Sequence, residues 1–219
     1  MLALLRKELQ VELRTKEALS SLLLLGLLTL LVLSFAFDPA SELRLEAAPG
    51  ALWVAVTFAG VLGLNRSFLA ERENDCLYGL LLCPRDRGTI YLAKALANFI
   101  FMLAAQVVIV PIFIFFFNLP LAATLEGTLV SLPLGLLGFA AVGTLFAAIS
   151  VRTRAREVML PLLLIPLVVP IFIAGVKVTA HLLAGKALGD VLQWVHLMIG
   201  FDAVFLVVGW WVFEYAVEE

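Results

Sequence analysis

Long apolar runs separated by short polar segments dominate this sequence. Six runs approach the about 20 residues that a helix needs to cross the hydrocarbon core of a bilayer. The second is the weakest, because Asn65 and Arg66 interrupt its end, and Pro49-Gly50 marks its start. The pattern predicts an all-α integral membrane protein with six transmembrane helices, near residues 18–37, 51–69, 91–117, 125–151, 158–178 and 195–217.

The segment that precedes the first span, residues 1–17, has the pattern of an amphipathic helix. Leu2, Leu5, Leu9 and Leu13 recur at helical spacing on one face, and the charged residues lie mostly elsewhere. We expect an interfacial helix in the headgroup plane with its leucines pointing into the lipid. Its mixed charge and the long run that follows favour a retained anchor over a cleaved signal peptide.

The composition agrees with a membrane protein of one domain, residues 1–219. Apolar residues make up 63% of the chain, where a soluble protein has about half, and charged residues only 15%. The formal net charge of -2 gives no field that would favour nucleic acid. Two cysteines, Cys76 and Cys83, and two distant histidines cannot assemble a zinc site, so we expect no metal.

The basic residues predict the orientation. Basic residues concentrate in cytoplasmic segments. Twelve of the fifteen fall before span one, between spans two and three with Lys94 just beyond, and between spans four and five, whereas the other side holds Arg44, Lys177 and Lys186. We therefore expect both termini in the cytoplasm.

Within the fourth span, small residues recur every four positions at Ala140, Thr144 and Ala148. Small residues let helix backbones approach closely in lipid. This face could pack against another helix of the same chain or against a second copy, and the pattern does not choose between them.

Three polar residues near the outer side are candidate functional residues. Asp202 lies at membrane depth, where acids are costly and usually functional, although it is near enough to the outer end of its span to reach the interface. His181 and His196 lie near Trp194 and could ligate haem iron or titrate. The alternative is that they are interfacial polar residues beside an aromatic anchor.

No enzyme motif is present. The sequence contains no GxSxG, HExxH or GxxxxGK[ST] pattern, so we expect neither hydrolase chemistry nor a phosphate-binding loop for ATP. It also lacks CxxCH, the motif for covalent attachment of haem. The chain is therefore expected not to be an enzyme.

The longest predicted cytoplasmic loop, residues 65–90, has an amphipathic pattern of its own. A run of acids is followed by leucines on one helix face, and a proline ends the segment. This favours a short helix over 71–84 that docks into a groove on a partner, although a solvated loop on the membrane would have the same composition. The candidate docking residues are Glu71, Glu73, Asp75, Leu77, Leu80, Leu81 and Pro84.

Together these features resemble the ABC-2 type permeases (type V exporter-like fold), and more narrowly the CcmB family, the haem exporter protein B permeases of cytochrome c maturation. The resemblance covers essentially the whole chain and is carried by LRKELQVELRTKE, APGALWVAVTFAGVLGLNRSF, LLLCPRDRGTIYLAKALANF and LPLLLIPLVVPIFIAG. The family loop commonly reads Gly-(Ser/Thr)-Leu-Glu where this chain has Asp75-Cys76-Leu77-Tyr78. The detailed contacts to a partner are therefore expected to differ.

The resemblance implies a permease subunit in the bacterial cytoplasmic (inner) membrane. It implies a homodimer with two CcmA-type ATPase subunits that bind ATP and Mg²⁺, and association with CcmC, CcmD and the haem chaperone CcmE. In this family the segment corresponding to 71–84 is the coupling helix. ATP hydrolysis would then drive haem export or the release of loaded chaperone, with haem as the candidate substrate. The few candidate haem ligands in the spans favour release, and Trp210-Trp211 lacks the WGxxWxWD haem motif of CcmC.

Other functions remain open at this stage. An ABC-2 permease for lipid or polysaccharide would share the fold, because fold does not fix substrate. A secondary transporter without an ATPase would need an intramembrane site, for which Asp202 is the candidate. A passive scaffold would bind the same partners and tolerate an inactive ATPase.

Overall fold

The computed structural model describes residues 1–37, 42–67, 87–150 and 156–218, and every element in these ranges is a helix. Six of the helices are long and apolar enough to cross a membrane. The predicted all-α fold with six spans is confirmed. The elements are α1 (Leu2–Thr15), α2 (Glu17–Ala36), α3 (Glu42–Ser67), α6 (Arg87–Phe117), α7 (Leu121–Ser150), α8 (Arg156–Leu183), η1 (Leu188–Val191) and α9 (Leu192–Glu218).

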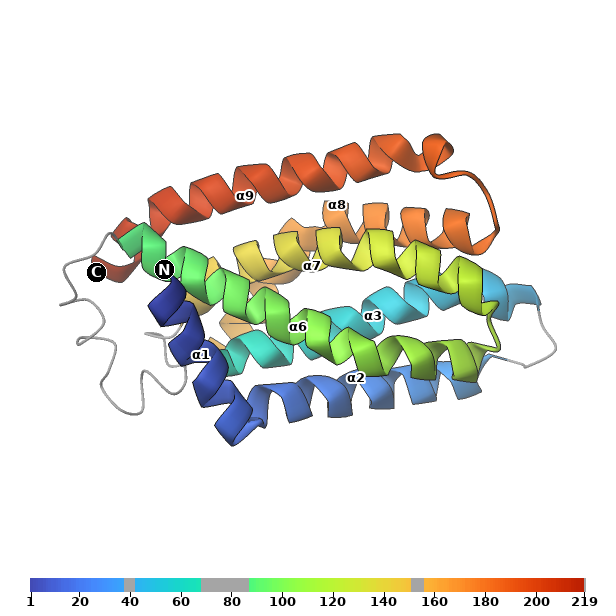
Figure 1. Cartoon of the computed structure of the whole chain (residues 1–219), viewed down its shortest axis with the longest axis horizontal. Helices are drawn as coiled ribbons and strands as arrows, with labels where there is room; N and C mark the ends of the chain where they lie inside the picture. Colours follow the sequence, from blue (N-terminus) through green and yellow to red (C-terminus); the bar gives the residue numbers. More distant parts are fainter. Residues whose placement is uncertain (38–41, 68–86, 151–155, 219) are drawn as a thin grey trace.

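The six long helices run alternately up and down one elongated bundle (Figure 1). Because their number is even, the N-terminus and the C-terminal end of α9 lie at the same end of the bundle, which we call the terminal end. The end of α3, the start of α6 and the end of α7 also lie there. The opposite end, here the far end, holds the α6–α7 turn and the α8–η1–α9 connection.

The second span is longer than predicted. Helix α3 begins at Glu42, where residue 51 was expected, and Pro49 lies inside the helix and is buried. An unwound segment in the hydrocarbon region would leave backbone groups unpaired, so continuing the helix past a proline is favourable there. Arg44 stabilises this extension, because its guanidinium donates to the backbone oxygen of Phe116 and lies 5.6 Å from the centre of the Phe117 ring.

The N-terminal segment is helical, as predicted, and one side of this helix packs against the bundle. Leu4 packs against the hydrophobic core, whereas Leu2 is 81% exposed. Four residues after Leu4, Glu8 contacts α6. Figure 1 shows α1 crossing the bundle steeply at the terminal end, against α6. The helix is thus part of the packed bundle, and its contact with headgroups remains a prediction.

The core of the bundle lies around α7, the most buried of the six spans. The indole of Trp53, on α3, fills the space beside Gly135 of α7 and Gly175 of α8, where a side chain on either glycine would collide with it. Phe172 of α8 packs on the same indole, with 5.8 Å between ring centres. Helix α3 therefore packs against both α7 and α8, which also pack closely against each other.

The last span is the least buried of the six. It is attached through a narrow inward face, on which Met198, Asp202 and Phe213 are buried. The hydroxyl of Tyr91, on α6, contacts the backbone oxygens of Ala141 on α7 (3.0 Å) and Phe205 on α9 (3.3 Å). One buried phenol therefore joins three helices.

Candidate functional site

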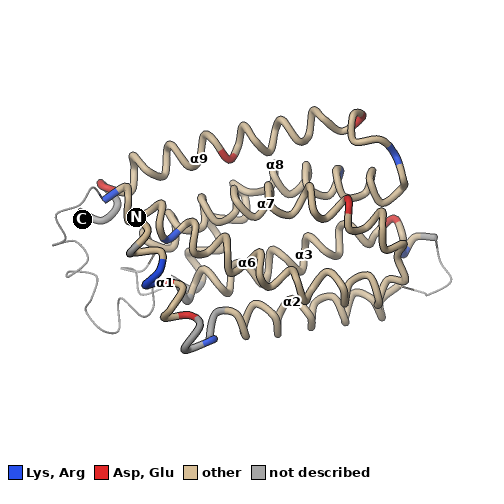
Figure 2. The backbone as a smooth tube through the Cα atoms, viewed as in Figure 1, with Lys and Arg blue, Asp and Glu red and all other residues tan. Residues whose placement is uncertain are grey.

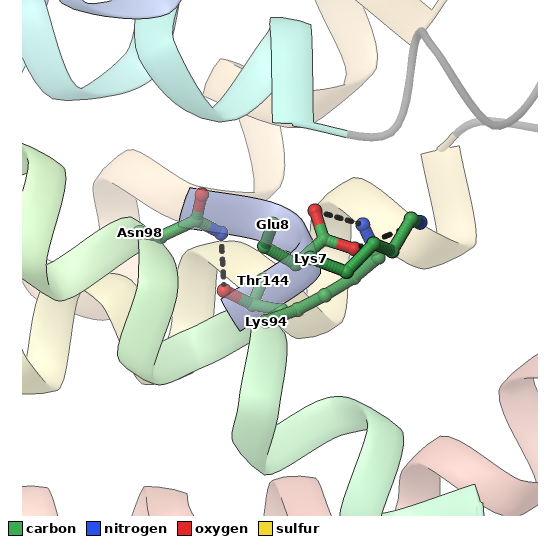
Figure 3. Close-up of polar contacts among 5 residues, drawn as sticks. All are labelled: Lys7, Glu8, Lys94, Asn98 and Thr144. Carbon is green, nitrogen blue, oxygen red and sulfur yellow. Dashed lines mark hydrogen bonds and ion pairs between the residues drawn. The ribbon is translucent and has the colours of Figure 1, made fainter. Parts of the chain in front are cut away.

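A charged cluster lies at the terminal end, where α1 meets α6 (Figure 3). The ammonium nitrogen of Lys94 is 3.3 Å from Oε2 of Glu8, and the lysine side chain is only 2% exposed. Oε1 of the same glutamate contacts Lys7 at 3.2 Å, at the surface. A buried charge requires a close partner of opposite sign. We call the Glu8–Lys94 pair the α1 clamp.

One helical turn beyond Lys94, a polar contact joins α6 to α7. The Asn98 side-chain amide donates to Oγ1 of Thr144 at 2.9 Å, and both residues are buried (Figure 3). Ala140 and Ala148, the other predicted small residues on this face, are also buried inside the single chain. The structure therefore places these three residues at intramolecular helix contacts.

A second acid on α1 fixes the corner with α2. Oε1 of Glu12 accepts a hydrogen bond from the backbone N–H of Leu19, in the first turn of α2, at 2.9 Å. The first N–H groups of a helix lack partners in the helix itself, so a carboxylate there acts as a cap. Between the helices Lys16 has φ 56°, the left-handed conformation that reverses the chain direction.

Asp202 is buried, and this corrects the expectation that it reaches the outer interface. Its side chain is 4% exposed and lies beside Gly138 of α7 and Ile171 of α8. Neither carboxylate oxygen has a hydrogen-bond partner of good geometry in the described part of the chain, although the backbone of Gly138 is adjacent. Charged residues lie mainly toward the two ends of the bundle (Figure 2), whereas Asp202 lies well inside α9, which spans Leu192–Glu218.

The two histidines lie at the far end. His181 is in the last turn of α8, and Nε2 is 3.4 Å from Oδ2 of Asp190 in η1. His196 lies in the first turns of α9 and is exposed. The contact of His181 ties the α8–α9 connection to the bundle. The interpretation of both residues as interfacial or as haem ligands remains open.

A buried hydroxyl network joins the three central helices. The indole N–H of Trp53 donates to Oγ1 of Thr179 on α8, at 3.1 Å, and Oγ of Ser131 on α7 lies 2.8 Å from the same atom. In lipid, such contacts satisfy polar groups that water cannot reach. This network was not predicted, because a tryptophan and two hydroxyl residues on separate spans show no spacing that links them.

The candidate coupling segment, 71–84, lies outside the described residues. The helix ends on either side of it, Ser67 of α3 and Arg87 of α6, are both at the terminal end. Sequence reasoning also missed Glu8 and Lys94 as partners. The signal was available, because a lysine inside a span and an acid on the adjacent amphipathic helix are both costly unless paired.

Within the described ranges, no three histidine, cysteine or acidic side chains come together as metal ligands. The polar groups instead connect helices in pairs and triplets: α1 with α6, α6 with α7, and α3 with α7 and α8.

Known proteins match this chain over most of its length. The family model described as CcmB protein matches residues 1–219. "Heme exporter protein B" of Rhodobacter capsulatus is 31% identical over 188 residues, 86% of each chain. The protein of the same name from Pseudomonas aeruginosa is 30% identical over 172 residues, 78% of this chain and 77% of the relative. This multi-pass membrane protein therefore belongs to the CcmB family.

Proposed function

We propose that this chain is the permease subunit of an ABC-type complex for c-type cytochrome maturation in the bacterial inner membrane. The observation that carries the proposal is the family match over all 219 residues, together with relatives named heme exporter protein B. The subunit itself is not catalytic. It couples ATP hydrolysis in a CcmA-type partner to haem export, or to release of the haem-loaded chaperone CcmE, at the outer face.

The position of the polar groups supports a coupling role. The segment 71–84 connects two helix ends at the terminal end of the bundle, where α1 is also anchored. An ATPase bound there would act on α3 and α6 directly. We propose Glu71, Glu73, Asp75, Leu77, Leu80, Leu81 and Pro84 as the docking residues, CcmC and CcmD as further partners, and a homodimer as the working form.

Of the two outcomes, we favour release of the chaperone. The chain has two histidines, and both lie near the far end, in the last turn of α8 and the first turns of α9. Histidine is a common axial ligand of haem iron. A haem moving through the bundle would find no histidine along its depth.

The docking segment can be tested by purification of the complex in mild detergent. Leu77→Asp and Leu80→Asp would each place a charge on the apolar face that enters the partner, so we expect loss of the copurified ATPase. The matched control is Leu188→Asp, the same substitution at the exposed far end, which should leave the ATPase bound. Equal recovery of the ATPase with all three variants would overturn this docking site.

The function is tested in a strain that lacks the chromosomal copy. The chain expressed with an active ATPase should restore c-type cytochromes, and the chain with an ATPase that cannot hydrolyse ATP should not. Restoration with the inactive ATPase would indicate a passive scaffold. If no ATPase copurifies and uptake or export follows the proton gradient, the secondary-transporter alternative is favoured instead.

A further inference from the structure

The α1 clamp is unusual because a lysine is buried inside a transmembrane helix bundle. Lys94 is among the largest fully buried side chains of the described residues, next to Trp53 and Tyr91. Its partner Glu8 belongs to α1, and the glutamate side chain is itself only 15% exposed. Removing one member of a buried ion pair is costly, since the other then loses this counter-charge.

The clamp is joined by a second polar contact between α1 and a neighbouring helix. This second contact is the cap that Glu12 forms on the N-terminus of α2. Glu8 and Glu12 are four residues apart, so they lie on the same face of α1. One acid binds the helix to α6 and the other binds it to α2, and the left-handed Lys16 makes the turn between α1 and α2.

Helix α6 extends this linkage to α7. Lys94 and Asn98 are also four residues apart, and Asn98 donates to Thr144 (Figure 3). Successive turns of α6 therefore contact α1 and then α7. Because each contact is buried and polar, sliding of α6 past either neighbour would break it.

We propose that Glu8 and Lys94 are positioning residues, which clamp α1 to α6 so that the two helices move as one body. The proposal rests on the proposed function for its biological consequence. Helix α6 begins at Arg87, directly after the segment proposed to bind the ATPase, so movement imposed on that helix reaches α1 through this pair. Helix α1 then moves together with the bundle and does not move independently at the membrane surface.

The attachment of α1 can be measured by cysteine accessibility in the full-length chain. Cys76 and Cys83 are replaced by serine, and Leu4→Cys is introduced as the reporter, because Leu4 packs against the core. In permeabilised membranes a water-soluble maleimide should label this cysteine slowly. Glu8→Gln should raise the labelling rate about tenfold or more, since loss of the ion pair removes an attraction that holds α1 against α6.

Two further variants separate the ion pair from a general loss of packing. The exchange Glu8→Lys with Lys94→Glu restores opposite charges and should bring labelling back toward the parent rate. Lys7→Gln removes the surface contact to the same glutamate, where Lys7 is 43% exposed, and should change the rate less than about twofold. If the charge-exchange variant fails to accumulate, the comparison of Glu8→Gln with Lys7→Gln still decides the question, because the Glu8 side chain is partly exposed.

The functional consequence of the clamp is measured with the same variants in complex with the ATPase. We expect Glu8→Gln to retain the bound ATPase and its ATP hydrolysis while c-type cytochrome yield falls severalfold, and the charge exchange to recover the yield. Equal labelling of Leu4→Cys in the parent and in Glu8→Gln would overturn the clamp and leave the proposed function intact. Failure of the parent chain to capture any ATPase would instead refute the proposed function and leave the clamp standing.

Discussion

At the scale of single residues, Trp53 is held on several sides in the described core. Its indole lies against two glycines on different helices, Gly135 and Gly175, and its N–H donates to Thr179. An indole is large and needs a hydrogen-bond partner when buried. The two glycines supply the room, and the threonine supplies the partner. The closeness of α3, α7 and α8 thus depends on three residue choices on two helices.

Gly175→Ala should therefore destabilise the bundle. The added methyl group would overlap the indole of Trp53, and overpacking of this kind costs about 1–3 kcal/mol. Thermal unfolding in detergent measures the effect as a lowered midpoint. The matched control is Gly200→Ala on α9, where an added methyl group meets nothing within 4 Å, and its midpoint should not fall. Equal midpoints for both variants would contradict this packing.

At the scale of helices, single polar contacts join neighbouring spans, and one of them links α6 to α7. Thr144→Val removes the acceptor that Asn98 uses between α6 and α7. Because interhelical hydrogen bonds in membranes contribute about 0.6 kcal/mol on average and up to about 1.7, we expect a loss in that range. The control is Thr57→Val, since the Thr57 hydroxyl bonds only to the backbone of Trp53 on its own helix among the hydrogen bonds described.

The contribution of the Asn98 contact is given by the difference between the free energies of unfolding of the two threonine variants. Unfolding in detergent by a denaturing surfactant gives both free energies on one scale. A larger loss for Thr57→Val than for Thr144→Val would show that the Asn98 contact does not hold α6 to α7.

The helices could be predicted from the sequence, whereas their contacts could not. Apolar length alone gave six spans, and the leucine period gave the N-terminal helix. The start of α3 was missed because a proline such as Pro49 usually marks a helix boundary. In lipid the helix is favoured to continue past the proline, since an unwound segment would leave backbone groups without hydrogen-bond partners. The pairing of Glu8 with Lys94 was missed, because the leucine period of α1 carries no information about which residue of α6 an acid on α1 will contact.

The same limit applies to the candidate site. Asp202 could be singled out because any acid in a span is costly, yet its direction depends on which face α9 turns toward α7. The small-residue period in α7 predicted close packing but not the partner helix. The residue pattern of one helix shows which of its faces are apolar or small, whereas the helix that packs against each face depends on the arrangement of all six spans.

At the scale of the whole molecule, the arrangement of the two ends makes the orientation testable. Lys186, in the exposed connection at the far end, and Arg6, exposed on α1 at the terminal end, lie at opposite ends of the bundle. In a chain without Cys76 and Cys83, a membrane-impermeant maleimide should label Lys186→Cys in intact cells. Arg6→Cys should be labelled only after the membrane is opened, because we predict the terminal end to be cytoplasmic.

The native cysteines provide an independent check on that orientation. Cys76 and Cys83 belong to the predicted cytoplasmic segment, so both should be protected from the impermeant reagent in intact cells. Labelling of either native cysteine from outside, or of Arg6→Cys before permeabilisation, would reverse the assignment of the two ends.

The placement of Trp53 has a spectroscopic consequence. The chain has four tryptophans, and Trp53 is 2% exposed, whereas Trp210 and Trp211 are 43% and 67% exposed. With Trp194, Trp210 and Trp211 replaced by phenylalanine, the remaining emission would report on the centre of the bundle alone. An opening between α3, α7 and α8 during turnover would shift that emission to longer wavelength and admit acrylamide as a quencher. Emission that stays constant while ATP is hydrolysed would place the moving parts elsewhere in the molecule.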